Sequence, residues 1–304
     1  MGSEMCIRDR SSAMSTRLTV LEPSSTPDST VLNANLIKLN DFGFQVNYQR
    51  YPLDVGDRQG KSGVYARSQA LATALADPKC AYVLAARGGY GTSDLLRHLD
   101  WSALSASPAT MVVGFSDISA LQVALYARLG WPGIHGPMPG SSLWTNGEDV
   151  ARLLHLLSSS RPWNSAISVS RLAGSSVNDE IEGILIGGCL SVLSALIGTP
   201  YFPKSLKNHI LFIEDTHESG ERILRFWNQW VDSGLVTDLA AVVLGRFTDL
   251  SGNHDEEWLV NRLVERCTAR VFRSSDFGHV SPNYPLVTGA KARIEGNNLK
   301  WSLS

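Results

Sequence analysis

The sequence has few cysteines and little net charge, and each shortage excludes a class of protein. Its 304 residues include four cysteines, Cys6, Cys80, Cys189 and Cys267, which lie far apart without a CxxC pair. This spacing argues against a zinc site and against a disulfide framework, and it favours a reducing compartment. A net charge of -2 gives no electrostatic reason to expect nucleic acid or an anionic membrane as a partner.

The sequence also lacks membrane and secretion signals. No apolar run approaches the roughly 20 residues of a membrane helix, and the N-terminus has no apolar core of the kind found in signal peptides. We therefore expect a cytoplasmic protein whose partner is a small molecule, not nucleic acid or a membrane. Residues 1–15 fit neither a periodic element nor a targeting pattern, and we expect an extension outside the fold there.

Short apolar strands alternate with helical patterns in the first half of the chain. Strands are predicted at 17–21, 81–86 and 111–113, and helices at 31–39, 64–76 and 118–129. The second helix should stop at Asp77-Pro78, because proline cannot continue a helix, and the third at Gly130. The alternation predicts an α/β fold, with a Rossmann-like parallel sheet in an N-terminal domain of residues 16–157.

A serine-rich stretch at residues 158–178 shows little periodicity, so we expect a linker there. Beyond it, residues 179–304 are predicted to form a smaller C-terminal α/β domain that opens with a glycine-rich turn at Gly187-Gly188. Its predicted elements are strands at 210–213 and 240–244 and helices at 220–231 and 255–269. Two domains agree with a length near twice the usual domain size of roughly 100–200 residues.

Ser116 lies in the turn Gly114-Phe115-Ser116-Asp117, between a predicted strand and a predicted helix. A strand-turn-helix context exposes a serine side chain and aims free backbone N–H groups at developing negative charge, as a nucleophile requires. The competing interpretation is that Ser116 only caps its helix. The motif lacks the full G-x-S-x-G pattern because position 118 is Ile118, so the turn alone leaves both interpretations open.

A second loop, Arg87-Gly88-Gly89-Tyr90-Gly91, also follows a predicted strand. Its glycines let the backbone approach a ligand, so an amide of Gly88 or Gly89 could join that of Asp117 as an oxyanion hole. A phosphate-binding loop is disfavoured because neither G-x-G-x-x-G nor G-x-x-x-x-G-K-[ST] is present. A glycine turn without a ligand remains an alternative.

A serine nucleophile needs a base, itself oriented by a third group. His279 follows a glycine outside any predicted element, where functional histidines are common, although a structural histidine is the simpler interpretation. Glu214 ends an apolar strand, where a carboxylate is costly without a partner. A structural salt bridge is the alternative. His217 and Glu221 have the i, i+4 spacing of metal ligands, but HExxH is absent and we expect no metal.

Together, six motifs in this order resemble the LD-carboxypeptidase family of serine peptidases, which includes muramoyltetrapeptide carboxypeptidases and microcin C immunity peptidases. The motifs are Arg87-Gly88-Gly89-Tyr90-Gly91, Gly114-Phe115-Ser116-Asp117, His135-Gly136-Pro137, Gly187-Gly188 with Leu190-Ser191, Glu214-Asp215 and Gly278-His279. The match runs from about residue 17 to the C-terminus. It makes helix capping a much weaker interpretation of Ser116.

The resemblance implies a Ser-Glu-His triad of Ser116 as nucleophile, His279 as general base and acid, and Glu214 as the group that orients His279. The implied oxyanion hole is the backbone of Asp117 with Gly88 or Gly89. The family builds this site at the interface of its two domains. It requires no cofactor, and it suggests a homodimer.

The implied reaction hydrolyses an L,D-amide bond, as in the release of D-alanine from a cytoplasmic murein tetrapeptide during cell-wall recycling. Arg87 is a candidate for holding the terminal carboxylate of the substrate, and Tyr90 and Cys189 are further candidates for substrate contacts. Cys189 stands where many members have asparagine, and it is expected to be a packed residue. Residues 59–63 also depart from the usual acidic approach to the helix.

Two rival functions follow from the same residues. A microcin-immunity-type peptidase would cleave an aminoacyl-nucleotide or acyl-sulfamoyl conjugate with the same triad. A non-catalytic Rossmann-like protein would bind a small molecule at the glycine loop, with Ser116 only as a cap.

Overall fold

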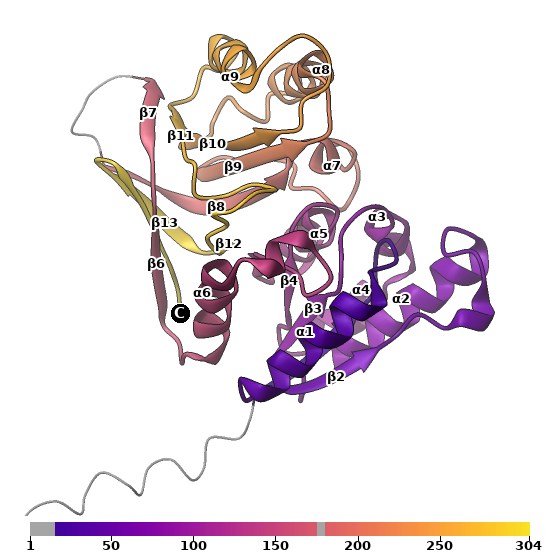
Figure 1. The fold of residues 1–304 in the computed structure, drawn as a ribbon. Coiled ribbons are helices and arrows are strands. Elements are labelled where there is room, and N and C mark those ends of the chain that lie inside the picture. The colour runs from indigo at the N-terminus through magenta and orange to yellow at the C-terminus, as the bar shows by residue number, and fades with distance from the viewer. Residues whose placement is uncertain (1–15, 175–179) are drawn as a thin grey trace, which may run out of the picture.

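The computed structural model describes residues 16–174 and 180–304, which form a mixed α/β fold with two sheets (Figure 1). The first sheet has the strand order β12-β5-β4-β3-β1-β2. Its strands are β1 (Arg17–Leu21), β2 (Gln45–Gln49), β3 (Tyr82–Ala85), β4 (Met111–Gly114), β5 (Gly133–His135) and β12 (Leu286–Thr288). All neighbours pair in parallel except β12, which runs antiparallel to β5. The predicted parallel sheet is confirmed.

Helices connect the strands of the first sheet. They are α1 (Ser29–Asp41), α2 (Lys61–Ala76), α3 (Thr92–Leu95), α4 (Trp101–Ser105), α5 (Ile118–Leu129) and α6 (Gly147–Ser158), with short 3-10 turns η1 (Leu53–Val55), η2 (Leu96–His98) and η3 (Ser142–Thr145). Local sequence sets several ends. The carboxylate of Asp28 accepts from the amides of Thr30 and Val31 at the start of α1. Gly130 ends α5 with a left-handed φ of 69°.

The second sheet has the order β6-β14-β13-β8-β9-β10-β11-β7. Its strands are β6 (Trp163–Ser168), β7 (Ser170–Ala173), β8 (Ile181–Cys189), β9 (His209–Thr216), β10 (Ala241–Thr248), β11 (Val271–Arg273), β13 (Lys291–Glu295) and β14 (Asn298–Leu303), and its helices are α7 (Leu190–Ser194), α8 (Gly220–Asp232) and α9 (Glu256–Glu265). The run from β8 to β11 is parallel, and the remaining pairs are antiparallel.

The prediction of an irregular linker at 158–178 is wrong for residues 163–168 and 170–173, which form β6 and β7. β6 buries Trp163 and Ile167 and exposes Asn164, Ala166 and Ser168, so it has the alternation of a half-buried strand. β7 pairs with β11, far away in the sequence. Residues 175–179 lie outside the described residues.

The predicted turn at Gly187-Gly188 is also wrong, because both glycines lie inside β8. A Cβ on Gly187 would collide with the carbonyl oxygen of Phe212 on β9, and one on Gly188 would collide with the hydroxyl of Ser119 on α5. The glycines are therefore explained by close packing on both sides of the strand. After most strands of the second sheet, the chain also adds β12 to the first sheet, where it pairs with β5.

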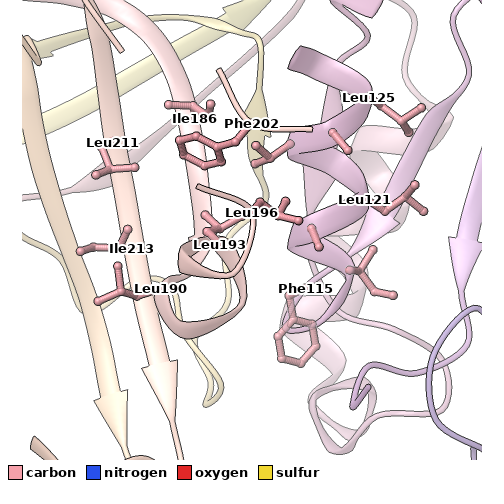
Figure 2. Close-up of a cluster of buried hydrophobic side chains, with 14 of the residues drawn as sticks. Phe115, Leu121, Leu125, Ile186, Leu190, Leu193, Leu196, Phe202, Leu211 and Ile213 are labelled. Atoms are coloured by element: carbon pink, nitrogen blue, oxygen red, sulfur yellow. The ribbon is translucent and has the colours of Figure 1, made fainter. Parts of the chain in front are cut away.

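Helix α5 lies between the two sheets, and Figure 1 shows α8 and α9 on the opposite side of the second sheet. Every residue from Ile118 to Leu125 is buried, as expected for a helix that is covered on all sides. Figure 2 shows Leu193, Leu196 and Phe202 between α5 and the strands of the second sheet. Within the described residues, no helix has both the length and the apolar character needed to cross a membrane.

Candidate active site

Ser116 lies between the end of β4 and the start of α5, with a left-handed φ of 63°. Non-glycine residues rarely adopt this conformation, and strained backbone of this kind is enriched at functional sites. The helix cap position is occupied by Asp117, without a side-chain capping bond. Among the described residues, the Ser116 hydroxyl makes no hydrogen bond, so it does not act as a cap in this structure.

The glycine loop lies directly against Ser116. A Cβ on Gly88 would lie 3.0 Å from Ser116 Cβ and 3.3 Å from Ser116 Oγ. Gly89 has a φ of 113° and packs against Ser25 so closely that a Cβ would collide with the Ser25 hydroxyl. Within residues 16–174 and 180–304, the amides of Gly88, Gly89 and Asp117 donate no hydrogen bond. They are therefore available to an oxyanion.

His279 and Glu214 form a tight pair on the second sheet's side of the site. Glu214 lies near the end of β9 and is fully buried, and its Oε2 is 2.5 Å from His279 Nδ1. His279 lies in the loop after β11, preceded by Gly278 with a φ of 147°. The ring of Phe115, the residue before Ser116, meets the His279 ring edge-on at 5.0 Å between centroids.

Burial and neighbouring charges shift the pKa values of Glu214 and His279 in opposite directions. Burial would raise the pKa of Glu214, but His279 and His135 lower that pKa to about 2. Burial also lowers the pKa of His279, but the adjacent Glu214 carboxylate raises it above its ordinary value. The carboxylate therefore stays ionised and favours the protonated imidazole, as an orienting acid does in a nucleophile-base-acid triad.

The contact between Phe115 and His279 places the His279–Glu214 pair next to the residue that precedes Ser116. Ser116 comes from the first sheet, and the other two come from the second. Among the described residues His279 makes no hydrogen bond to Ser116, and its only hydrogen bond is to Glu214. Catalytic hydrogen bonds are often long without substrate and shorten when substrate binds.

Two further candidate residues, Arg87 and Tyr90, lie in the glycine loop. Arg87 is exposed and donates to the carbonyl of Thr26 at 2.9 Å, and Tyr90 is exposed and donates its hydroxyl to Asp94 at 3.0 Å. Among the described residues, neither is hydrogen-bonded or ion-paired to Ser116, Glu214 or His279.

Cys189 is buried at the end of β8. Its amide donates to the hydroxyl of Ser119 at 3.1 Å, and its Sγ lies 3.5 Å from Asp215 Oδ1. Burial, with the charges of Asp215 and Glu214, raises the pKa of the thiol well above its ordinary value. A thiol with a raised pKa is a poor nucleophile, and the packed role expected for Cys189 agrees with this environment.

The side chains of His217 and Glu221 have different partners and do not form a shared site. His217 Nε2 lies 4.0 Å from Asp249, and Glu221 lies 3.2 Å from His254 instead. In the described part of the chain, no group of three or more histidine, cysteine, aspartate or glutamate side chains could hold a metal ion.

Sequence reasoning missed two features of the site. His135 is buried beside Glu214, with its Nε2 3.9 Å from Glu214 Oε1, although it was noted only as part of a motif. The side chain of Asp117 is also buried, and it accepts from Ser24 and Thr92. No signal in the sequence identifies Ser24 or Thr92 as its partners, because both lie far from it along the chain.

Comparisons with known proteins identify the family that this chain resembles. Residues 18–136 match the LD-carboxypeptidase N-terminal domain, and residues 182–294 match the LD-carboxypeptidase C-terminal domain. The murein tetrapeptide carboxypeptidase of Pseudomonas aeruginosa is 32% identical over 295 residues, which cover 94% of this chain and 95% of that protein. The microcin C7 self-immunity protein MccF of Escherichia coli is 24% identical over 290 residues, which cover 84% of each chain. The crystal structure of muramoyltetrapeptide carboxypeptidase from Oxalobacter formigenes has a TM-score of 0.79 and 27% identity, covering 94% of this chain and 99% of that one.

Proposed function

Because this chain belongs to the LD-carboxypeptidase family, we propose that it is a serine carboxypeptidase that hydrolyses an L,D-amide bond and releases C-terminal D-alanine from murein tetrapeptide. One observation supports this most directly. Ser116 is held in a strained turn beside free backbone amides, and the ring of the preceding Phe115 contacts His279, which pairs with Glu214. A protein that only binds a small molecule would not need this combination.

The chemistry follows from the positions of the groups. His279 Nδ1 donates to Glu214, which leaves Nε2 to accept the proton of the Ser116 hydroxyl as Oγ attacks the substrate carbonyl. His279 then gives this proton to the nitrogen of the leaving D-amino acid. Water, deprotonated by the same imidazole, hydrolyses the acyl-enzyme and restores Ser116.

The carbonyl oxygen of the substrate becomes negative in the tetrahedral intermediate. The amide of Asp117 and an amide of Gly88 or Gly89 are proposed to bind it, since these donors have no other partner among the described residues. Loss of one such donor typically slows an enzyme by about 10²–10³-fold.

Arg87, Tyr90 and Cys189 remain candidates for substrate contacts. Arg87 is exposed at the glycine loop, where it could pair with the terminal carboxylate. Cys189 is more deeply buried and would act through packing. We further propose a cytoplasmic homodimer that works in cell-wall recycling without a cofactor.

The test is D-alanine release from L-Ala-D-Glu-diaminopimelate-D-Ala, with EDTA present. Wild type should release D-alanine, whereas Ser116→Ala, His279→Ala and Glu214→Ala should fold but release none above about a thousandth of the wild-type rate. His135→Ala should retain part of the activity because His135 lies outside the triad. Equal release by Ser116→Ala, or inhibition by the chelator, would contradict a serine mechanism.

A second candidate function is supported by the likeness to the microcin C7 self-immunity protein. Its substrate would be an aminoacyl conjugate, cleaved by the same residues. If the tetrapeptide is not cleaved but an aminoacyl-sulfamoyl adenosine is, and Ser116→Ala abolishes that cleavage, the assignment moves to this class. If neither compound is cleaved, the catalytic proposal fails for both.

A further inference from the structure

The side chain of Asp117 points away from the proposed reaction and into the protein. The residue is buried, and its Oδ2 accepts a short hydrogen bond from the Ser24 hydroxyl and one of 2.9 Å from the amide of Thr92. The hydroxyl of Thr92 in turn donates to the carbonyl oxygen of Asp117 at 2.6 Å. The residue that follows the nucleophile is therefore held at both its side chain and its backbone.

These partners belong to the two other loops that surround Ser116. Thr92 begins α3, directly after the glycine loop, and Ser24 lies in the loop after β1. Next to Ser24, the amide of Ser25 donates to the carbonyl of Gly88 at 3.3 Å, and the Ser25 hydroxyl accepts from the amide of Tyr90 at 3.1 Å. The carboxylate of Asp117 thus connects the nucleophile turn directly to Thr92, just after the glycine loop, and through Ser24 to the neighbouring Ser25, which contacts the loop.

A buried cation supports the same loops. The guanidinium of Arg67 donates to the carbonyls of Pro23 at 2.6 Å and Gly91 at 3.1 Å, and to that of Arg58 at 2.8 Å. Burial raises the pKa of Asp117, while the hydrogen bonds from Ser24 and Thr92 and the charge of Arg67 oppose this rise. A buried carboxylate is tolerated only with such partners.

From this arrangement we infer that the side chain of Asp117 is a positioning residue that sets the distance between the two halves of the oxyanion hole. One half is the amide of Asp117 itself, and the other is an amide of Gly88 or Gly89. The inference rests on the proposed serine mechanism. Its consequence is kinetic, because a donor that moves by about 1 Å can cost roughly 100-fold in rate.

The readout should report the oxyanion hole without depending on the identity of the substrate. A fluorophosphonate probe phosphonylates a serine by forming an Oγ–P bond and releasing fluoride, and its phosphoryl oxygen becomes more negative as Oγ attacks. The rate of Ser116 labelling, measured by mass spectrometry, therefore depends on the same amides. D-alanine release then adds the separate effects on kcat and KM.

Asp117→Ala should slow labelling of Ser116 by about 10–100-fold and lower kcat similarly, with KM unchanged. Asp117→Asn can place its amide oxygen at the position of Oδ2 and accept from both Ser24 and Thr92, so it should restore labelling to near the wild-type rate. The matched control is Asp255→Ala. Asp255 also accepts from a backbone amide, that of Trp258 at the start of α9, so its loss should change stability but not labelling.

Three results would overturn the inference. They are labelling of Asp117→Ala at the wild-type rate, labelling of Asp117→Asn as slow as that of Asp117→Ala, and slowing of Asp255→Ala to the same degree. If Asp117→Ala does not fold, Ser24→Ala replaces it, since it removes the hydroxyl donor to Asp117 Oδ2. Ser24→Ala should slow labelling, and a wild-type rate would contradict the inference. Wild type that labels at Ser116 but releases no D-alanine refutes the proposed substrate and leaves this test intact.

Discussion

At the scale of single residues, the proposed chemistry depends on a buried carboxylate and the imidazole that it contacts. Glu214 is fully buried, yet its pKa is lowered to about 2 by His279 and His135 against the effect of burial. The same contact raises the pKa of His279. The imidazole must be neutral to accept the Ser116 proton, so wild-type activity should rise with pH. Because the pKa of His279 is raised, this rising limb of the pH–rate profile should lie above pH 6.5.

Glu214→Gln should move this limb to lower pH. Without the negative charge, the main remaining effect on His279 is burial, which lowers its pKa. The plateau of kcat/KM should also fall by at least about 100-fold, because the imidazole loses the group that orients it. A pH–rate profile measures both effects.

Glu221→Gln is the control, because Glu221 is exposed and pairs with His254 away from the triad. Its profile should match that of wild type. A Glu214→Gln limb at the wild-type pH, or at higher pH, would mean that Glu214 does not act on the base.

Candidate residues of the triad could be predicted because each is marked in the sequence by its neighbours. Ser116 and His279 follow loop glycines or turn residues, and Glu214 ends an apolar strand. The partners of the Asp117 side chain could not be predicted, because Ser24 is 93 residues away and Thr92 is 25 residues away. Only the parallel sheet, which gathers the ends of β1, β3 and β4 at one edge, brings them together.

At the scale of elements, the end of β9 presents two adjacent carboxylates to opposite sides. Glu214 contacts His279, while Asp215 accepts from the amides of Ser191 and Thr216 at 2.7 and 2.9 Å. Asp215 thereby ties the start of α7 to β9. Burial and the charge of Glu214 nevertheless raise the pKa of Asp215 to about 6.

This raised pKa predicts how stability depends on pH. Protonated Asp215 contributes stability that is fully present below about pH 3.8 and is lost as the pH rises through about 6. Asp215→Asn cannot ionise, so it does not lose this stability. The unfolding free energy of the variant relative to that of wild type should therefore rise by about 3 kcal/mol as the pH increases across this range. Urea unfolding at a series of pH values measures the shift.

The exposed residue Asp238 supplies the control for this measurement. Asp238→Asn removes an exposed carboxylate by the same substitution, so it is the variant with which the Asp215→Asn shift is compared. A constant difference between Asp215→Asn and wild type would show that Asp215 does not titrate differently in the folded and unfolded states.

Secondary structure could be predicted best where one local signal dominated. The helix ends at Asp77-Pro78 and Gly130 agree with the structure, because proline and a left-handed glycine act locally. β7 and β12 could not be predicted, because each is defined by a partner strand far away in the sequence. The glycines of β8 resemble a turn in the sequence, and only packing against Phe212 and Ser119 explains them.

At the scale of the whole molecule, the two sheets share their hydrophobic cores. One buried cluster includes Val112 of the first sheet and Leu211 of the second, and the other includes Val20 and Phe212 in the same way. Helix α5, which begins just after Ser116, is covered by both sheets. We therefore expect the relative position of the nucleophile and its base to be fixed by packing, and the molecule to unfold as one cooperative unit.

Leu39→Ala tests this expectation. Leu39 is fully buried on α1, which packs on the first sheet, so its truncation should cost about 2–5 kcal/mol. If the molecule is one unit, hydrogen exchange through global unfolding should accelerate by the same factor in β1 of the first sheet and in β10 of the second. Exchange measured by mass spectrometry resolves the two strands.

The same helix offers the control, since Ile37 is 61% exposed and Ile37→Ala removes little buried surface. Its exchange should match wild type in both sheets. Acceleration by Leu39→Ala in β1 alone would mean that the sheets open separately. In that case the site would be assembled by docking of two independent units, and Leu39→Ala would leave the Glu214–His279 pair intact while it loosened the turn that holds Ser116.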